Sequence, residues 1–131
     1  MALRQFQNKY EERNTMTKQY SDMLLLINRN GMGDADPDLQ GKLIKTYFTL
    51  LDENGILPAA ICFYAEGVRL VVEGSAVLDP LKSLEAKGVR IIICSTCLNF
   101  YGLAEKVSVG IVGGMTDILE AQLRAGKVIT L

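Results

Sequence analysis

Histidine is absent from the 131 residues, which excludes a Ser-His-Asp hydrolase and a Cys-His protease. The chain also lacks an excess of either charge: 14 basic and 15 acidic residues are scattered along it, which argues against nucleic-acid partners. Apolar runs are only about five or six residues long, whereas a membrane-spanning helix needs about 20. No secretory signal is visible at the N-terminus. We therefore expect a cytoplasmic protein without nucleic-acid or membrane partners.

Cysteine is scarce, and two of the three cysteines stand close together. An odd number of cysteines without an export signal argues against a disulfide framework. Cys62 lies inside an apolar run and is expected in the core. Cys94 and Cys97 form a Cys-x-x-Cys motif directly after the apolar run 89–93. A closed zinc site needs four ligands, so without histidine one chain cannot complete it, and we expect neither a metal nor a cofactor.

Short apolar runs alternate with amphipathic segments, a pattern typical of an α/β domain. The runs predict strands over residues 23–27, 59–64, 89–93, 107–112 and 128–131. Apolar residues at helical spacing predict helices over residues 38–53, from 75 or 79 to 87, 98–103 and 116–125. Residues 67–72 have strand-like composition but no clear geometry. The order predicts a three-layer α/β/α domain over residues 22–131, with a mainly parallel sheet of about five strands, after a polar extension over residues 1–21.

Ligands of parallel sheets gather outside the carboxyl ends of the strands, where Cys94 is expected. The loop after the first strand lacks the Gly-Lys-Ser/Thr ending of a phosphate-binding loop, so we do not expect a nucleotide there. We expect a pocket at this edge, walled by Asn28, Met32, Gly33, Gly114 and Met115. Ser95 and Thr96 are candidate hydrogen-bond donors, although hydroxyls in turns more often bond their own backbone.

The residues alone leave several roles open for Cys94 and Cys97. A Cys-x-x-Cys between a strand and a helix is the thioredoxin arrangement, which favours dithiol redox chemistry. Sulfur transfer through a persulfide is the second possibility and requires an accessible thiolate of lowered pKa. A metal site shared between subunits is the third. The fourth is a pair of small residues packed without chemistry, as buried cysteines often are, in which case the protein is a non-catalytic oligomeric module that binds partners.

One family resemblance narrows these alternatives. The stretch from Gly88 to Leu103, GVRIIICSTCLNFYGL, resembles the cysteine-bearing segment of the DsrE/DsrF-like family. Residues 73–78 are similar to the start of the preceding helix in that family, and residues 28–45 resemble its first loop and helix. The similarity covers about residues 22–131, and among the branches it is strongest to the DsrE-like domain of YedF-type selenium-metabolism proteins, described as sulfurtransferase-like.

The resemblance implies a small homo-oligomeric α/β/α protein in intracellular sulfur or selenium relay. It places the persulfide-carrying cysteine of the family on Cys94, with Cys97 as an accessory thiol. YedF-type proteins carry a preceding domain similar to TusA, whereas a short polar leader precedes the body here. The resemblance therefore implies separate sulfur donor and acceptor proteins, TusA-like proteins among them.

Overall fold

The computed structural model describes residues 22–131, and the predicted extension over residues 1–21 lies outside them. Five strands form one sheet in the order β4-β3-β2-β1-β5, with every neighbouring pair parallel. The strands are β1 (Met23–Ile27), β2 (Ala60–Phe63), β3 (Arg90–Cys94), β4 (Ile111–Gly113) and β5 (Lys127–Thr130). The helices are α2 (Pro37–Glu53), α3 (Leu78–Ala86), α4 (Ser95–Phe100) and α5 (Met115–Arg124), with 3₁₀ helices η2 (Ala65–Val71) and η3 (Ala104–Lys106).

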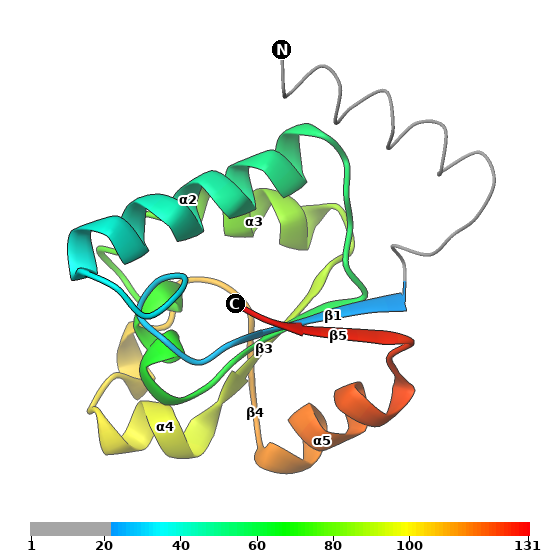
Figure 1. Ribbon diagram of the computed structural model, residues 1–131. Helices are drawn as coiled ribbons and strands as arrows, with labels where there is room; N and C mark the ends of the chain where they lie inside the picture. Colours follow the sequence, from blue (N-terminus) through cyan, green and yellow to red (C-terminus); the bar gives the residue numbers. More distant parts are fainter. Residues whose placement is uncertain (1–21) are drawn as a thin grey trace, which may run out of the picture.

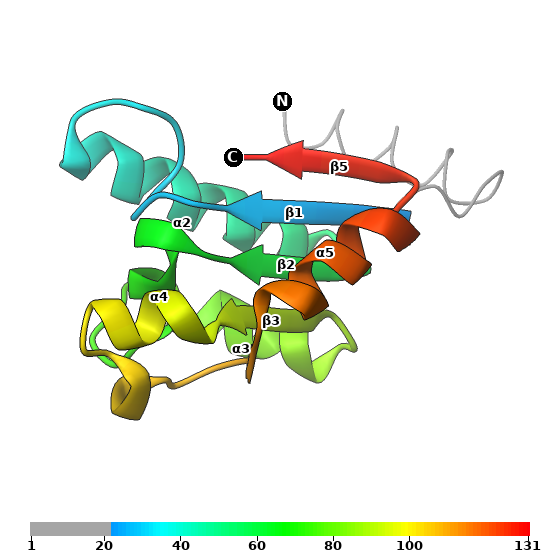
Figure 2. The same ribbon diagram turned by 90° about the horizontal axis from the view of Figure 1, so that it is seen from below.

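Helices cover both faces of the sheet, so the predicted three-layer α/β/α domain is confirmed. Figure 1 shows α2 and α3 on one face and α5 on the other. In the turned view of Figure 2, β1, β2 and β5 point the same way, and α4 lies toward the carboxyl end of the sheet. None of the helices within residues 22–131 is long and apolar enough to cross a membrane.

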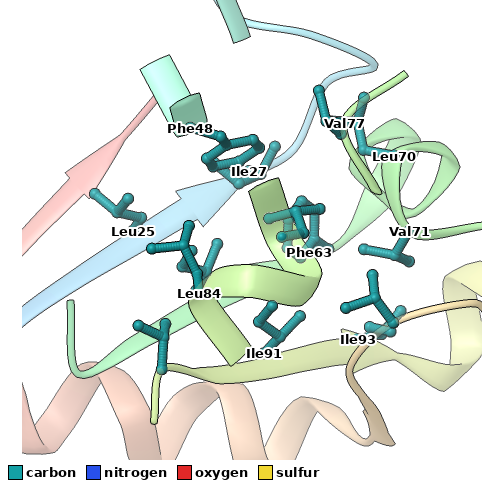
Figure 3. Packing of buried hydrophobic residues seen from close by; sticks show 14 of the residues in the cluster. Leu25, Ile27, Phe48, Phe63, Leu70, Val71, Val77, Leu84, Ile91 and Ile93 are labelled. Carbon is teal, nitrogen blue, oxygen red and sulfur yellow. The ribbon is translucent and has the colours of Figure 1, made fainter. Parts of the chain in front are cut away.

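The alternation of side chains along the strands builds two cores of different size. The face under α2 and α3 takes every second strand residue, Leu25, Ile27 and Phe63 among them, and joins the larger cluster (Figure 3). Within this cluster the rings of Phe48 on α2 and Phe63 lie 6.2 Å apart. The opposite face contributes the remaining strand residues, and α5 covers them with Ile118 and Ala121. Both faces are buried along β1 and β2, which explains their continuous apolar runs.

Three expected boundaries are corrected by the structure. The fourth strand begins at Ile111 rather than at Val107, because Val107 pairs antiparallel with Val72 in an isolated bridge before the chain turns. The helix after Cys94 covers Ser95–Phe100 rather than residues 98–103, so Cys94 is its N-cap. The ambiguous segment 67–72 belongs mostly to the 3₁₀ helix η2.

The start of η2 is pressed against the carboxyl end of β1. The Tyr64 N–H donates to the Ile27 carbonyl over 3.0 Å. A Cβ on Gly67 would lie 2.1 Å from the same oxygen, so only glycine allows this approach. Ala65 between them has a φ of 50°, a left-handed conformation that is rare outside glycine. Tight packing thus sets the direction of the Ala65 N–H.

Candidate functional site: a cysteine pair at the carboxyl end of the sheet

The Cys-x-x-Cys motif closes β3 and opens α4. Cys94 is the last residue of the strand, and Cys97 lies in the first turn of the helix. The Cys97 Sγ donates to the Cys94 Sγ over 3.2 Å. Cys94 is only 1% exposed, whereas Cys97 is partly exposed. Cys94 is therefore less accessible than a sulfur carrier was expected to be, and the thiol nearer to solvent is Cys97.

A backbone N–H from the segment after β2 contacts this cysteine pair. The Ala65 N–H donates to the Cys97 Sγ over 3.1 Å. Burial raises the pKa of the Cys97 thiol, the hydrogen bond with Cys94 raises this pKa further, and the Ala65 N–H opposes the rise. The Ala65 N–H stabilises the thiolate form of Cys97, because it donates its hydrogen bond to the sulfur. The left-handed Ala65 thus contributes a sulfur-binding amide.

The side chains of Glu66, Arg69 and Tyr101 connect η2 to the end of α4. The Arg69 Nε lies 2.5 Å from the Glu66 Oε2, and the Arg69 guanidinium stacks 4.5 Å above the Tyr101 ring. The bond to Arg69 is the main cause that lowers the pKa of the Glu66 carboxyl, and the nearby Tyr101 hydroxyl lowers it further. Ala65 is near the start of the same 3₁₀ helix and Cys97 is four residues before Tyr101. The cluster therefore connects η2, which begins at Ala65, to the end of the helix that carries Cys97.

Asn28, Tyr64 and Cys94 stand in a row across β1, β2 and β3. Ile27 pairs with Phe63 and Phe63 pairs with Ile93, so the next residue of each chain segment falls at the same level. Because side chains alternate, all three belong to the face that α5 covers. The Asn28 Nδ2 donates to the Tyr64 Oη over 3.3 Å. The Asn28 Oδ1 is buried and makes no hydrogen bond within residues 22–131.

The other predicted pocket residues after β1 bond elsewhere. The Met32 N–H donates to the Gln40 carbonyl over 3.1 Å, and the Gly33 carbonyl accepts from the Gln40 side chain. The Met32 side chain packs against the larger core. Within the described chain, no hydrogen bond joins this loop to the cysteines, so the structure ties Met32 and Gly33 to the start of α2.

The remaining predicted residues flank the cysteines. Ser95 and Thr96 form the first turn of α4, and neither hydroxyl makes a hydrogen bond within the part of the chain that the structure describes. Cys94 pairs with Gly113 at the end of β4, so Gly114 follows directly beside the motif. The Gly114 N–H donates to the Asp117 carboxylate over 2.8 Å as the N-cap of α5. Met115 is next and is 56% exposed.

Cys62 lies in the core, as the sequence predicted. It is fully buried on the α5 face, between Leu26 of β1 and Ile92 of β3 in register. Burial raises the pKa of its thiol to about 11, and the nearby Arg90 only partly opposes the rise. Such a thiol stays protonated at neutral pH and is a poor nucleophile.

Two observations limit what else this chain offers. A cleft of about 460 Å³ opens beside α2 and η2, but its lining, which includes Arg69, Ser75 and Leu103, contains neither cysteine. This cleft and the thiol chemistry are therefore separate, and we assign the site by its chemistry. Among residues 22–131, no group of three or more His, Cys, Asp or Glu side chains is placed to hold a metal ion.

The fold and the cysteine pair define a small α/β protein with thiols at the carboxyl end of a parallel sheet. The DsrE/DsrF-like family model matches residues 14–131. The chain belongs to the DsrE/DsrF-like family, whose members are known in sulfur relay. This confirms the predicted family, and the narrower resemblance to YedF-type proteins stays a prediction. No curated protein sequence matches the chain.

Solved structures show the same fold in three organisms. The ychN protein from E. coli has a TM-score of 0.62 at 16% identity, over 84% of this chain and 99% of that one. MTH1491 from Methanobacterium thermoautotrophicum, of unknown function, has a TM-score of 0.61 at 18% identity, over 83% and 97%. BT1422 from Bacteroides thetaiotaomicron, also of unknown function, has a TM-score of 0.57 at 18% identity, over 88% and 99%. At these identities the likeness concerns the fold alone.

Proposed function

We propose that this protein is a sulfurtransferase of a sulfur relay that carries a persulfide on Cys94. The observation that supports this most is the 3.2 Å approach of the Cys94 and Cys97 sulfurs at the carboxyl end of the sheet. Family membership gives the sulfur-relay context. Cys62 contributes no chemistry, because its raised pKa keeps it protonated.

Loading and unloading are two thiolate attacks that need no base or cofactor. The Cys94 thiolate attacks the outer sulfur of a donor persulfide, R–S–SH. An S–S bond forms to Cys94, the donor S–S bond breaks, and the donor leaves as R–S⁻. An acceptor thiolate then attacks the outer sulfur on Cys94, and Cys94 leaves as thiolate. Each step exchanges one S–S bond for another, so no net oxidant is consumed.

Cys97 has an accessory role in this scheme. Because Cys94 is 1% exposed, Cys97 and other neighbours must move aside when a donor approaches. The Cys97 thiolate can also attack the inner sulfur of a Cys94 persulfide, which forms a Cys94–Cys97 disulfide and releases HS⁻. Its raised pKa keeps Cys97 mostly protonated at neutral pH, so this loss of cargo is slow.

The partners of this reaction are separate sulfur donor and acceptor proteins, with TusA-like proteins as the leading candidates. Selenium in the outer position undergoes the same attack, so a selenium-bearing persulfide is the alternative cargo. We also expect self-association, because apolar residues of β4 and α5 are exposed. This exposed apolar surface consists of Ile111, Val112, Met115, Leu119 and Leu123.

Mass spectrometry of single-cysteine variants tests the proposal. After incubation with a persulfide donor and removal of the excess, the wild type should gain the mass of one sulfur atom. Cys94→Ser should lose this gain, and Cys97→Ser should keep it, with slower release of HS⁻. Cys62→Ala is the matched control and should load like the wild type. No gain in the wild type, or full loading of Cys94→Ser, would contradict the assignment.

Dithiol redox chemistry is the second candidate, and the same short distance between the two sulfurs favours it. If the protein is a dithiol redox protein, Cys94→Ser and Cys97→Ser should abolish the thiol–disulfide reaction equally. A wild type that forms the disulfide readily but gains no sulfur would support this candidate over the relay.

A further inference from the structure

We propose that Asn28 and Tyr64 bind an amide group of the molecule that brings or removes the sulfur, and so select peptide-borne persulfides. This inference rests on the proposed relay at Cys94 and concerns the recognition of its substrate. The two side chains act as positioning residues, because they hold the group next to the reacting sulfur rather than the sulfur itself.

The location of the pair is set by the strand register. Asn28, Tyr64 and Cys94 occupy one level of three adjacent parallel strands and share the face covered by α5. Neighbouring strands lie about 4.8 Å apart, so the backbones of Asn28 and Cys94 are about 10 Å from each other. A cysteine persulfide on an extended peptide spans such a gap, with its outer sulfur at Cys94 and its main-chain amides beside β1.

The hydrogen-bonding state of the pair leaves one acceptor and one donor free. The Asn28 Nδ2 donates to the Tyr64 Oη, and therefore the Tyr64 hydroxyl hydrogen is directed elsewhere. Within residues 22–131 that hydrogen has no acceptor, and the buried Asn28 Oδ1 has no donor. A buried polar atom without a partner is unfavourable by about 1–3 kcal/mol, so a ligand that supplies the donor is favoured. Because the Oδ1 is closed to solvent, the Asn28 side chain must turn outward for this bond to form.

The chemistry of the free groups indicates the class of ligand. In an extended peptide the amide N–H and the carbonyl of one residue point to the same side, and they can bond to the Asn28 Oδ1 and to the Tyr64 hydroxyl. Inorganic polysulfide and simple alkyl persulfides have no N–H group and leave the Asn28 oxygen unpaired. A site that hydrogen-bonds its substrate discriminates against analogues that lack the bonding group.

The packing of the α5 face does not require a polar pair at Asn28 and Tyr64. Its buried strand residues below Asn28 and Tyr64, such as Leu26 and Cys62, pack without hydrogen-bonding side chains. Tyr64 is partly exposed at the end of the sheet, next to the Ala65 amide that contacts Cys97. A polar pair that only closed the core would be satisfied internally, as most buried polar groups are.

Two persulfides that differ in amide content test this inference. Loading rates of Cys94 are measured by rapid-quench mass spectrometry with the persulfide of N-acetylcysteine amide and with that of ethanethiol. For Tyr64→Phe and for Asn28→Leu we expect loading from the amide probe to fall about three- to tenfold, the loss of one hydrogen bond. Loading from ethanethiol persulfide should stay within about twofold of the wild type, since that probe has no hydrogen-bonding group besides its sulfurs and makes neither bond.

The ratio of the two rates separates recognition from folding. A variant that is merely destabilised slows both probes alike and leaves the ratio unchanged, which would overturn the inference. Tyr47→Phe is the matched control, because it removes a tyrosine hydroxyl on α2 that lies outside the row, and it should leave the ratio at its wild-type value. Failure of both probes to load the wild type would refute the proposed relay itself and not this pair alone.

Discussion

The two faces of the sheet differ in what they bury and in what they leave open. The face under α2 and α3 holds a closed core with two aromatic rings, Phe48 and Phe63. The face under α5 holds a smaller cluster of mostly medium-sized side chains. The same face carries the row of Asn28, Tyr64 and Cys94. We infer that the first face supplies most of the stability, and that the second carries the chemistry.

Adjacent residues of β2 allow the largest test of this comparison, because they point to opposite faces. Phe63→Ala should lower the free energy of unfolding by about 3–5 kcal/mol, since it removes a fully buried ring. Cys62→Ala on the α5 face should lower it by only about 1–2 kcal/mol, since a single sulfur is lost. Urea unfolding of both variants measures the difference. Equal losses would contradict the unequal share of the two faces.

A second prediction concerns the close approach that aims the Ala65 N–H. In Gly67→Ala the new Cβ meets the Ile27 carbonyl oxygen at 2.1 Å, so the backbone must shift, with a loss of about 1–3 kcal/mol in unfolding free energy. The shift weakens the N–H bond to the Cys97 sulfur, which raises the pKa of Cys97 further. Alkylation of Cys97 at neutral pH should therefore slow, because a smaller fraction is thiolate.

Gly41→Ala is the matched control for this prediction. Gly41 lies on α2 with open space around its Cα, so alanine should stabilise the helix by about 0.5–1 kcal/mol. It should leave the alkylation rate unchanged. A slower reaction in Gly41→Ala, or an unchanged one in Gly67→Ala, would show that the Ala65 amide does not control the thiol.

The smallest expected effect on stability concerns the outer side of α5. Leu123 is 78% exposed, so Leu123→Lys should change the free energy of unfolding by no more than about 0.5 kcal/mol. If a second copy covers this side, the variant should associate less, and sedimentation should show a lower mass than for the wild type. A wild type that sediments as a monomer would argue against self-association.

Most of the fold follows from local sequence patterns. Uninterrupted apolar runs identified β1 and β2, because strands covered on both faces have no polar residues to interrupt them. The run Ile91–Ile93 identified β3, in which Arg90 is the exposed first residue. The fourth strand was placed too early, since Val107 is apolar for a different reason: it pairs with Val72 outside the sheet. Residues 67–72 resembled a strand, and only the approach of Gly67 to β1 explains why they form η2 instead.

The site was predicted in part. The Cys-x-x-Cys motif over residues 94–97 predicted that Cys94 ends a strand and that Cys97 lies close to it. The contributions of Ala65 and Tyr64 were missed, because they depend on which strands are neighbours and on their register. One sequence signal could have identified Tyr64. It is the last residue of the apolar run 59–64 and carries a hydroxyl, and it is expected at the same edge of the sheet as Cys94.

Release of isotope-labelled sulfur from the loaded protein tests the relay most directly. The wild type is loaded with a donor persulfide that carries a heavy isotope in its outer sulfur, freed of donor, and mixed with an acceptor thiol. We predict that the label appears as the acceptor persulfide, that the protein returns to its unloaded mass, and that peptide mapping before release places the label on Cys94. Label that stays on the protein, leaves only as HS⁻, or maps to Cys62 would contradict the relay.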